Sequence, residues 1–234
     1  MRLLDVGAKL VASANRKKAL SAIEECGAVL VFPVANKKNP VSLWYKLHPR
    51  TEMKWEWSEN GDDRVPQLWY LREELSRSNQ VVYSKWYQNR ATFFSKELFT
   101  HLLSYLRPEE GLLPHDSNTL LEALKMDSPL STKHLKAAAE LQGRLNESLY
   151  NRAMKVLWDR LLIVGFGEID DSSFPSLAVG ATQNIFEELW IESQSIDSKN
   201  AEKYIFKKLG EDSLFLKYAR KVKAAARAEQ EMRK

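Results

Sequence analysis

One predicted helix carries a row of polar side chains of types suited to binding nucleic acid. At about 100° per residue the row spans an arc of about 100°, and it consists of Ser148, Asn151, Arg152, Lys155 and Asp159. The donors in this row can bind phosphates or base edges, and Arg and Asn are the usual readers of guanine and adenine. Any solvent-exposed helix also has a polar side, so the row alone leaves both interpretations open.

The opposite side of the same helix is apolar, which gives the helix a defined orientation. This side spans about 140° and consists of Leu149, Tyr150, Ala153, Met154, Leu157 and Leu161. We expect it to face a core. The helix should begin at Asn146, with the Asn146 side chain as its cap, and end at about Leu161.

The elements around this helix occur in a characteristic order. A short helix over 132–141 begins at Ser131, whose hydroxyl can accept a hydrogen bond from a free amide of the first turn. Gly143 can then take the positive φ of a tight turn. Two β-like runs, 162–169 and 176–181, follow the second helix. Helix, glycine turn, helix and β-hairpin is the order of a winged helix-turn-helix, which places its second helix in a DNA major groove.

The predicted winged helix supplies the candidate DNA-binding residues. Basic side chains on its first helix and in the turn occupy positions that commonly contact phosphates, and the polar row of the second helix would face the bases. The candidates are Lys133, Lys136, Arg144, Asn146, Ser148, Asn151, Arg152 and Lys155. The expected partner is double-stranded DNA. Asp170 and Asp171 at the hairpin tip argue against insertion of that tip into a minor groove.

The net charge of +4 is unevenly spread along the chain. Residues 199–234 hold 11 Lys and Arg against 5 Asp and Glu, whereas residues 1–198 carry a net charge of −2. The basic tail is therefore either a phosphate-binding arm or an ordinary solvated helix.

Several classes of protein are disfavoured by composition. No apolar run approaches the roughly 18 residues of a membrane span, and residues 1–20 lack a signal-peptide pattern. The single cysteine, Cys26, forms no internal disulfide and suits a reducing compartment. We therefore expect a cytoplasmic protein with no membrane partner.

Residue patterns for cofactor chemistry are also missing. The four histidines are scattered, with no i,i+4 pair and no cysteine cluster, so no zinc site is expected. Gly165-x-Gly167 lies in a predicted strand with no helix behind it, which argues against a dinucleotide or phosphate loop. We expect neither a metal nor any other cofactor.

The region before the winged helix is dense in aromatic residues between Trp44 and Tyr105. They either fill a core or, with interleaved Lys46, Arg50, Lys54, Lys85 and Arg90, stack exposed bases. Trp69 and Phe99 have helical partners at core spacing, which favours a core. The pattern predicts helices over 15–26, 68–75 and 95–106 and strands over 29–34 and 81–87.

These observations predict an α+β fold that is mostly helical. Residues 1–110 would form an aromatic-rich α/β domain, for which a winged-helix-like organisation is one option. Residues 107–117 are the best linker, a first helix over 118–126 begins the winged-helix domain of residues 118–195, and residues 197–234 form a basic helical tail broken at Gly210.

A set of short motifs resembles one known family. In chain order they are Phe32-Pro33, Ser42-Leu43-Trp44, Trp55-x-Trp57, Leu68-Trp69-Tyr70-Leu71, Tyr83-Ser84-Lys85, Phe93-Phe94-Ser95, Leu130-Ser131-Thr132, Asn151-Arg152-Ala153 and Val164-Gly165-Phe166-Gly167. Over residues 15–190 the chain is similar to short bacterial relatives of the AlkZ-type winged-helix DNA glycosylases. The resemblance implies a protein built on winged helices, with a link to the excision of alkylated or crosslinked bases.

The chain departs from this resemblance at two places. Such relatives usually have Tyr-Gly-Lys where this chain has Tyr83-Ser84-Lys85. AlkZ-type glycosylases place the attacking water with Gln-x-Gln or Gln-x-Asp, and none of the seven glutamines here is followed two positions later by Gln or Asp.

We therefore expect a non-catalytic protein that binds duplex DNA through a winged helix, linked to DNA repair by the resemblance. One alternative is a glycosylase with a different water-positioning residue, for which Gln67 and Asp63 would be tested first. Another is a winged-helix module for protein interaction.

Overall fold

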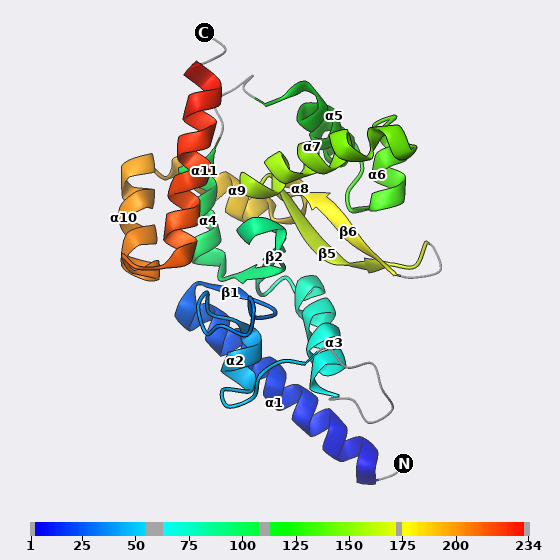
Figure 1. Ribbon diagram of the computed structural model, residues 1–234, viewed down its shortest axis with the longest axis vertical. Coiled ribbons are helices and arrows are strands. Elements are labelled where there is room, and N and C mark those ends of the chain that lie inside the picture. The colour runs from blue at the N-terminus through cyan, green and yellow to red at the C-terminus, as the bar shows by residue number, and fades with distance from the viewer. Residues whose placement is uncertain (1–2, 55–62, 108–112, 172–174, 232–234) are drawn as a thin grey trace.

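The computed structural model describes residues 3–54, 63–107, 113–171 and 175–231, and it has an α+β fold dominated by helices, as expected. Within these residues the strands form one antiparallel sheet in the order β1-β3-β2-β5-β6-β4. Figure 1 shows the sheet in the middle of the molecule, with α1 to α3 below it and the remaining helices above it. Trp55 and Trp57 lie outside the described residues.

The first part of the chain contains the three helices and two strands predicted for it, together with α2 and β3, which were not predicted. It contains α1 (Leu3–Cys26), β1 (Ala28–Leu30), α2 (Leu43–Leu47), α3 (Arg64–Arg77), β2 (Val82–Ser84), β3 (Thr92–Phe94) and α4 (Lys96–Leu106). Gly27 ends α1 with a φ of +75°, and the Ser95 hydroxyl caps α4 by accepting from the Leu98 amide.

Both strands predicted here are shorter in the structure than in the pattern. The strand predicted over 81–87 ends at Ser84, and residues Tyr87–Asn89 form a 3-10 turn, η1. Beyond the end of β2 the side chains of Trp86 and Tyr87 are buried in the core. Their rings pack against Phe215 and Tyr218 of the C-terminal helix, with centroids 5.1 to 6.4 Å apart.

The second part contains the predicted helix–turn–helix–hairpin order. Its elements are α5 (His115–Met126), β4 (Leu130–Ser131), α6 (Thr132–Ala138), the 3-10 turn η2 (Arg144–Asn146), α7 (Glu147–Asp159), β5 (Ile163–Ile169) and β6 (Ser176–Ala181). The Ser131 hydroxyl accepts from the His134 amide, 3.2 Å away, so the predicted cap is confirmed. Gly143 has the positive φ predicted for it, +87°.

One predicted cap is wrong. The Asn146 side chain makes no capping hydrogen bond, because the residue has a helical backbone at the end of η2. Its Nδ2 instead donates to the carbonyl oxygen of Gln142, 3.0 Å away, and closes the turn before α7.

The C-terminal helices pack on the first part of the chain. They are α8 (Thr182–Ile185), α9 (Glu187–Ser195), α10 (Ser198–Leu209) and α11 (Leu214–Glu231). The helical tail is broken at Gly210 as predicted, with a φ of +80°. α9, α10 and α11 all contact α4, and one core cluster joins residues such as Leu102, Phe186, Ile205 and Phe215. The tail is therefore part of the folded core.

Most of the described aromatic residues of the first part fill cores, as predicted. Trp44, Trp86, Phe93, Phe94 and Phe99 are completely buried. Trp69, which helical spacing had predicted to be in a core, is instead 44% exposed. The guanidinium of Arg72 lies 4.3 Å from the centre of the Trp69 ring, and the Phe32 ring stacks with Trp69 with the two centroids 6.4 Å apart.

Helix α3 is joined to the β5-β6 hairpin by a buried ion pair. Arg72 is buried, and its guanidinium donates to the Glu168 carboxylate. The Gly167 amide donates to the Ser76 hydroxyl, 3.1 Å away. Nearby, Tyr83 of β2 pairs with Gly165 of β5, and a Cβ at Gly165 would collide with the Tyr83 ring. These contacts join the regions before and after residue 110, and the proposed division into three domains stays a prediction.

Candidate nucleic-acid interface

Helix α7 has the two sides that its sequence predicts. Tyr150, Ala153, Met154 and Leu157 are buried in a cluster with α5, α6 and the hairpin, while Leu149 is half-buried. On the other side Ser148, Asn151, Arg152 and Lys155 are exposed. A large buried side explains why α7 is held in one orientation, so the polar side chains face solvent together.

The N-terminal end of this polar side carries an ion pair. Lys136 of α6 lies 2.6 Å from the Glu147 carboxylate, and the Lys136 ammonium also lies 4.6 Å from the centre of the Tyr150 ring. Asn151 Nδ2 donates to the same carboxylate at 3.4 Å. The hydrogen bond from Lys136 holds the pKa of the exposed Glu147 carboxyl below its ordinary value. Two candidate DNA-binding residues therefore share one acid.

The other basic side chains near the N-terminal end of α7 differ from Lys136 in their contacts. Arg152, Arg144 and Lys133 are exposed, and none of them makes an ion pair within the described part of the chain. A cation that is exposed and not committed to a carboxylate can bind an anion without first breaking an internal contact.

The C-terminal end of α7 is fixed by contacts from two other regions. Tyr218 of α11 donates its hydroxyl to Asp159 Oδ1 at 2.8 Å, and Trp86 Nε1 donates to the Asp159 carbonyl oxygen at 3.0 Å. The other carboxylate oxygen accepts from Lys155. Burial, followed by the negative charge of Asp159, raises the pKa of the Tyr218 hydroxyl, which keeps it protonated as a donor.

An open groove of about 590 Å³ begins at this end of α7 and runs between η1 and α11. Its polar lining consists of Gln88, Asn89, Lys155, Asp159, Lys217 and Lys221. Gln88 and Asn89 have positive φ values of 52° and 59°, a backbone conformation that is uncommon for residues other than glycine and often found at functional sites. The groove thus adds amides and cations to the polar side of α7.

Four of these groove residues were missed by sequence reasoning. Lys217 and Lys221 belong to the tail, whose positive charge was noticed but could not be placed near α7. Gln88 and Asn89 follow directly after the strand predicted over 81–87, and no element was predicted for them. The packing of Tyr87 against Tyr218 and the hydrogen bonds of Trp86 and Tyr218 to Asp159 bring these four residues to the end of α7.

The base of the β5-β6 connection is anchored through one carboxylate. Asp171 accepts hydrogen bonds from the Ser131 hydroxyl and from the Ser176 hydroxyl, 2.7 Å away. The bond from Ser131 is the main reason that the pKa of the Asp171 carboxyl lies below its ordinary value. Asp171 therefore has a structural task between α6 and the hairpin.

With this geometry described, comparison with known families becomes informative. A family model described as AlkZ related matches residues 14–217. The chain belongs to the AlkZ-related family. This membership connects it with DNA-repair proteins and with DNA as a partner. No match was found among curated proteins or among solved structures.

Ser84 occupies the position at which AlkZ-related proteins were expected to have glycine. Ser84 lies within β2, paired with Thr92 of β3, in extended backbone that any residue can adopt. Its hydroxyl is buried and has no hydrogen-bond partner among the described residues.

The two residues first considered for an AlkZ-related catalytic role are not near α7. Asp63 precedes α3 and Gln67 lies on its first turn, and both are exposed. α3 is on the other side of the sheet from α7 (Figure 1). Within the described residues no group of His, Cys, Asp or Glu could hold a metal ion, and no helix is long and apolar enough to cross a membrane.

Proposed function

We propose that residues 118–195 form a winged helix that binds duplex DNA, with α7 in the major groove, and that the protein does so without catalysis. The order α5, β4, α6, α7, β5, β6 and the pairing of β4 with β6 support a winged helix. The observation that carries the proposal is the polar side of α7, where Ser148, Asn151, Arg152 and Lys155 are exposed and the apolar side behind them is buried.

The candidate residues divide into two roles. Lys133, Lys136 and Arg144 lie on α6 and in the turn before α7, where contacts to phosphates orient such proteins without reading sequence. Asn151 and Arg152 have amide and guanidinium groups that suit adenine and guanine edges. Ser148 and Asn146, near the start of α7, would contact the sugar-phosphate backbone of the DNA.

The groove extends this interface beyond the winged helix. Lys155 belongs both to the polar side of α7 and to the groove, and Lys217 and Lys221 of α11 line the groove further on. A phosphate backbone that leaves α7 at Lys155 would therefore meet two more cations. This arrangement gives the basic tail a place in DNA binding.

Salt-dependent binding to duplex and single-stranded DNA tests the proposal. We expect tighter binding to the duplex, with affinity that falls as salt rises because bound phosphates release counterions. A module that only binds other proteins would show no such binding, and that result would overturn the proposal.

A second candidate function is base excision, because the chain belongs to the AlkZ-related family. The chain lacks the Gln-x-Gln or Gln-x-Asp motif. Among the described residues that line the groove, Asp159 is the one that carries a carboxylate. It is held by Tyr218 and Lys155 and could orient a water molecule. Release of free base from alkylated or crosslinked duplexes, lost in Asp159→Asn but retained in Asp63→Asn and Gln67→Ala, would favour this function. We expect no release by the parent protein.

A further inference from the structure

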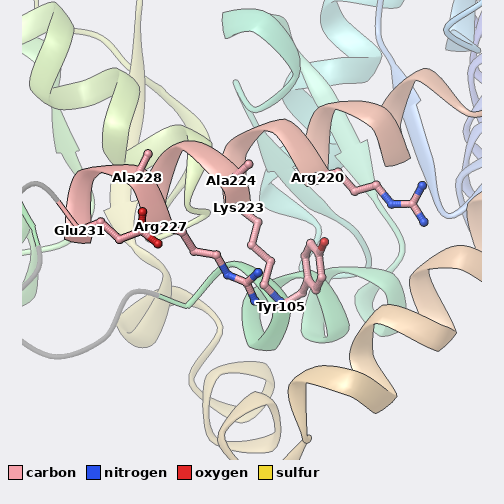
Figure 2. Close-up of a pocket in the computed structure, with 7 residues that line it drawn as sticks. All are labelled: Tyr105, Arg220, Lys223, Ala224, Arg227, Ala228 and Glu231. Carbon is pink, nitrogen blue, oxygen red and sulfur yellow. The ribbon is translucent and has the colours of Figure 1, made fainter.

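A second hollow lies on the side of α11 that faces away from the groove. It is open to solvent, has a volume of about 270 Å³ and lies between α11 and the end of α4. Figure 2 shows Lys223 and Arg227 reaching from α11 towards Tyr105, with Arg220 on the same side of the helix. Spacings of three and four residues place these three cations on one helical surface.

The contacts of these cations are mostly uncharged. The Lys223 ammonium lies 3.7 Å from the centre of the Tyr105 ring and donates to the Ser198 hydroxyl at 2.9 Å. The Arg220 guanidinium lies 6.0 Å from the Phe206 ring. Within the described residues none of the three makes an ion pair, although Glu231 also lines the hollow.

Three cations close together on one helical surface repel one another, and a bound anion would relieve that repulsion. Burial, and then the charge of Arg227, lower the pKa of the Lys223 ammonium, while Glu202 of α10 acts in the opposite direction. Burial is the main reason that the pKa of the Tyr105 hydroxyl is raised, while the charges of Arg220 and Arg227 act in the opposite direction. Guanidinium groups bind phosphate through paired hydrogen bonds, which makes a phosphate group the anion that fits best.

The position of the hollow indicates where such a phosphate comes from. Lys217 and Lys221 on one side of α11 line the groove that begins at α7, and Arg220 and Arg227 lie on the other side. The 18 residues of α11 span about 27 Å. A basic surface therefore crosses α11 from the groove to the second hollow.

We propose that the hollow formed by Tyr105, Arg220, Lys223 and Arg227 binds a backbone phosphate of the same DNA that α7 binds. The proposal rests on the proposed function, and it makes α11 a second DNA-binding element outside the winged helix. Because a phosphodiester carries no sequence information, this contact strengthens binding to all sequences alike.

Removal of two charges from the hollow tests the proposal. The double variant Arg220→Gln/Arg227→Gln keeps much of each side-chain stem, and Lys37→Gln/Lys38→Gln is its charge-matched control. These two lysines are exposed in the segment between β1 and α2, which lies away from the C-terminal end of α11 (Figure 1). Equal melting temperatures for the two variants and the parent would show that both are folded.

We expect the slope of log affinity against log salt to fall by up to about two units in the arginine variant and to stay unchanged in the control. The loss of affinity should be the same for unrelated duplexes. If the parent binds DNA and both variants keep its slope, this inference alone is overturned. If the parent does not bind DNA, the proposed function fails, and this inference fails with it.

Protection of a cysteine introduced at the hollow identifies the source of the phosphate. Ala224 is exposed and lines the hollow, so A224C can be alkylated, with K38C as the control position. We expect duplex DNA to slow alkylation at position 224 only. Equal protection by inorganic phosphate at matched ionic strength would assign the hollow to free phosphate and overturn the DNA assignment, as would absence of protection.

Discussion

Arg72 and Arg152 illustrate two different uses of the same residue type. Arg72 on α3 is 4% exposed, pairs with Glu168 and packs against the ring of Trp69. Arg152 on α7 is exposed and makes no ion pair within the described residues. The first arginine is committed to the fold, because its charge would be costly to bury without a partner. The second remains available to a ligand.

The surroundings of the two arginines show how this difference arises. Arg72 lies where α3 packs against β2 and the bulged strand β5, so its guanidinium is enclosed from several directions. Arg152 lies opposite the buried side of α7, where no described element covers it. Loss of Arg72 should therefore reduce stability, whereas loss of Arg152 should reduce DNA binding.

The largest effect is expected for Arg72→Ala. The variant leaves the Glu168 carboxylate enclosed without its partner, and breaking a buried ion pair in this way costs about 3–5 kcal/mol of the free energy of unfolding. Urea denaturation measures the loss. Replacing both partners, as Arg72→Met/Glu168→Leu, should recover most of it. A loss below about 1 kcal/mol in the single variant would place this pair with ordinary surface ion pairs.

The next largest effect is expected from neutralising the cations that precede α7. The triple variant Lys133→Gln/Lys136→Gln/Arg144→Gln should weaken binding to every duplex and reduce the salt slope by up to about three units, about one for each lost phosphate contact. Titrations at several salt concentrations measure this slope. An unchanged slope would mean that this surface does not meet the DNA backbone.

A smaller effect with a different signature is expected for Arg152→Ala. If Arg152 reads a base edge, the variant should lose about 1–3 kcal/mol of binding free energy at the preferred sequence and discriminate less between sequences. Its free energy of unfolding should change by no more than about 0.5 kcal/mol. Arg50→Ala, at another exposed position, is the matched control. Equal losses at all sequences would make Arg152 a phosphate contact instead.

The smallest effect is expected for Glu147→Gln. The variant frees Lys136 and Asn151 from their shared acid and removes a negative charge from the interface, so DNA binding should become modestly tighter. Weaker binding would show that Glu147 positions these side chains for DNA and does not compete with it.

The Glu147→Gln variant should bind DNA more tightly but be slightly less stable than the parent protein. The pKa of the Glu147 carboxyl is lower in the folded protein than its ordinary value. The ion pair between Glu147 and Lys136 therefore stabilises the fold at pH values above that ordinary pKa. This contribution is lost as pH falls through the lowered pKa. The small stability difference between parent and variant should therefore disappear in acid, which urea denaturation at several pH values can follow.

Local features of the fold could be predicted from the sequence because the interactions behind them span only a few residues. The capping hydroxyls of Ser131 and Ser95 each bind an amide three residues ahead. The two sides of α7 follow from helical periodicity alone. Strand ends were predicted less well, and after β2 the side chains of Trp86 and Tyr87 pack against the distant helix α11.

The candidate site was predictable only in part for the same reason. The order of helices and strands in residues 118–181 and the polar row of α7 could be predicted from the sequence. All eight candidate residues could therefore be named before their surroundings were known. The pairing of Lys136 with Glu147, the groove and the second hollow could not be named. Each depends on side chains from elements that are separate in the chain.

By itself, the sequence determined the capping residues Ser95 and Ser131 of two helices, which side of α7 is buried and that the chain resembles AlkZ-related proteins. Only the tertiary structure decided which charges are free. Arg72 and Glu168, 96 residues apart, are paired because α3 packs on β5. Lys155 and Lys217 line one groove because Tyr218 binds Asp159. Local periodicity specifies the direction of a side chain on its own helix, whereas the packing of distant elements decides what that side chain meets.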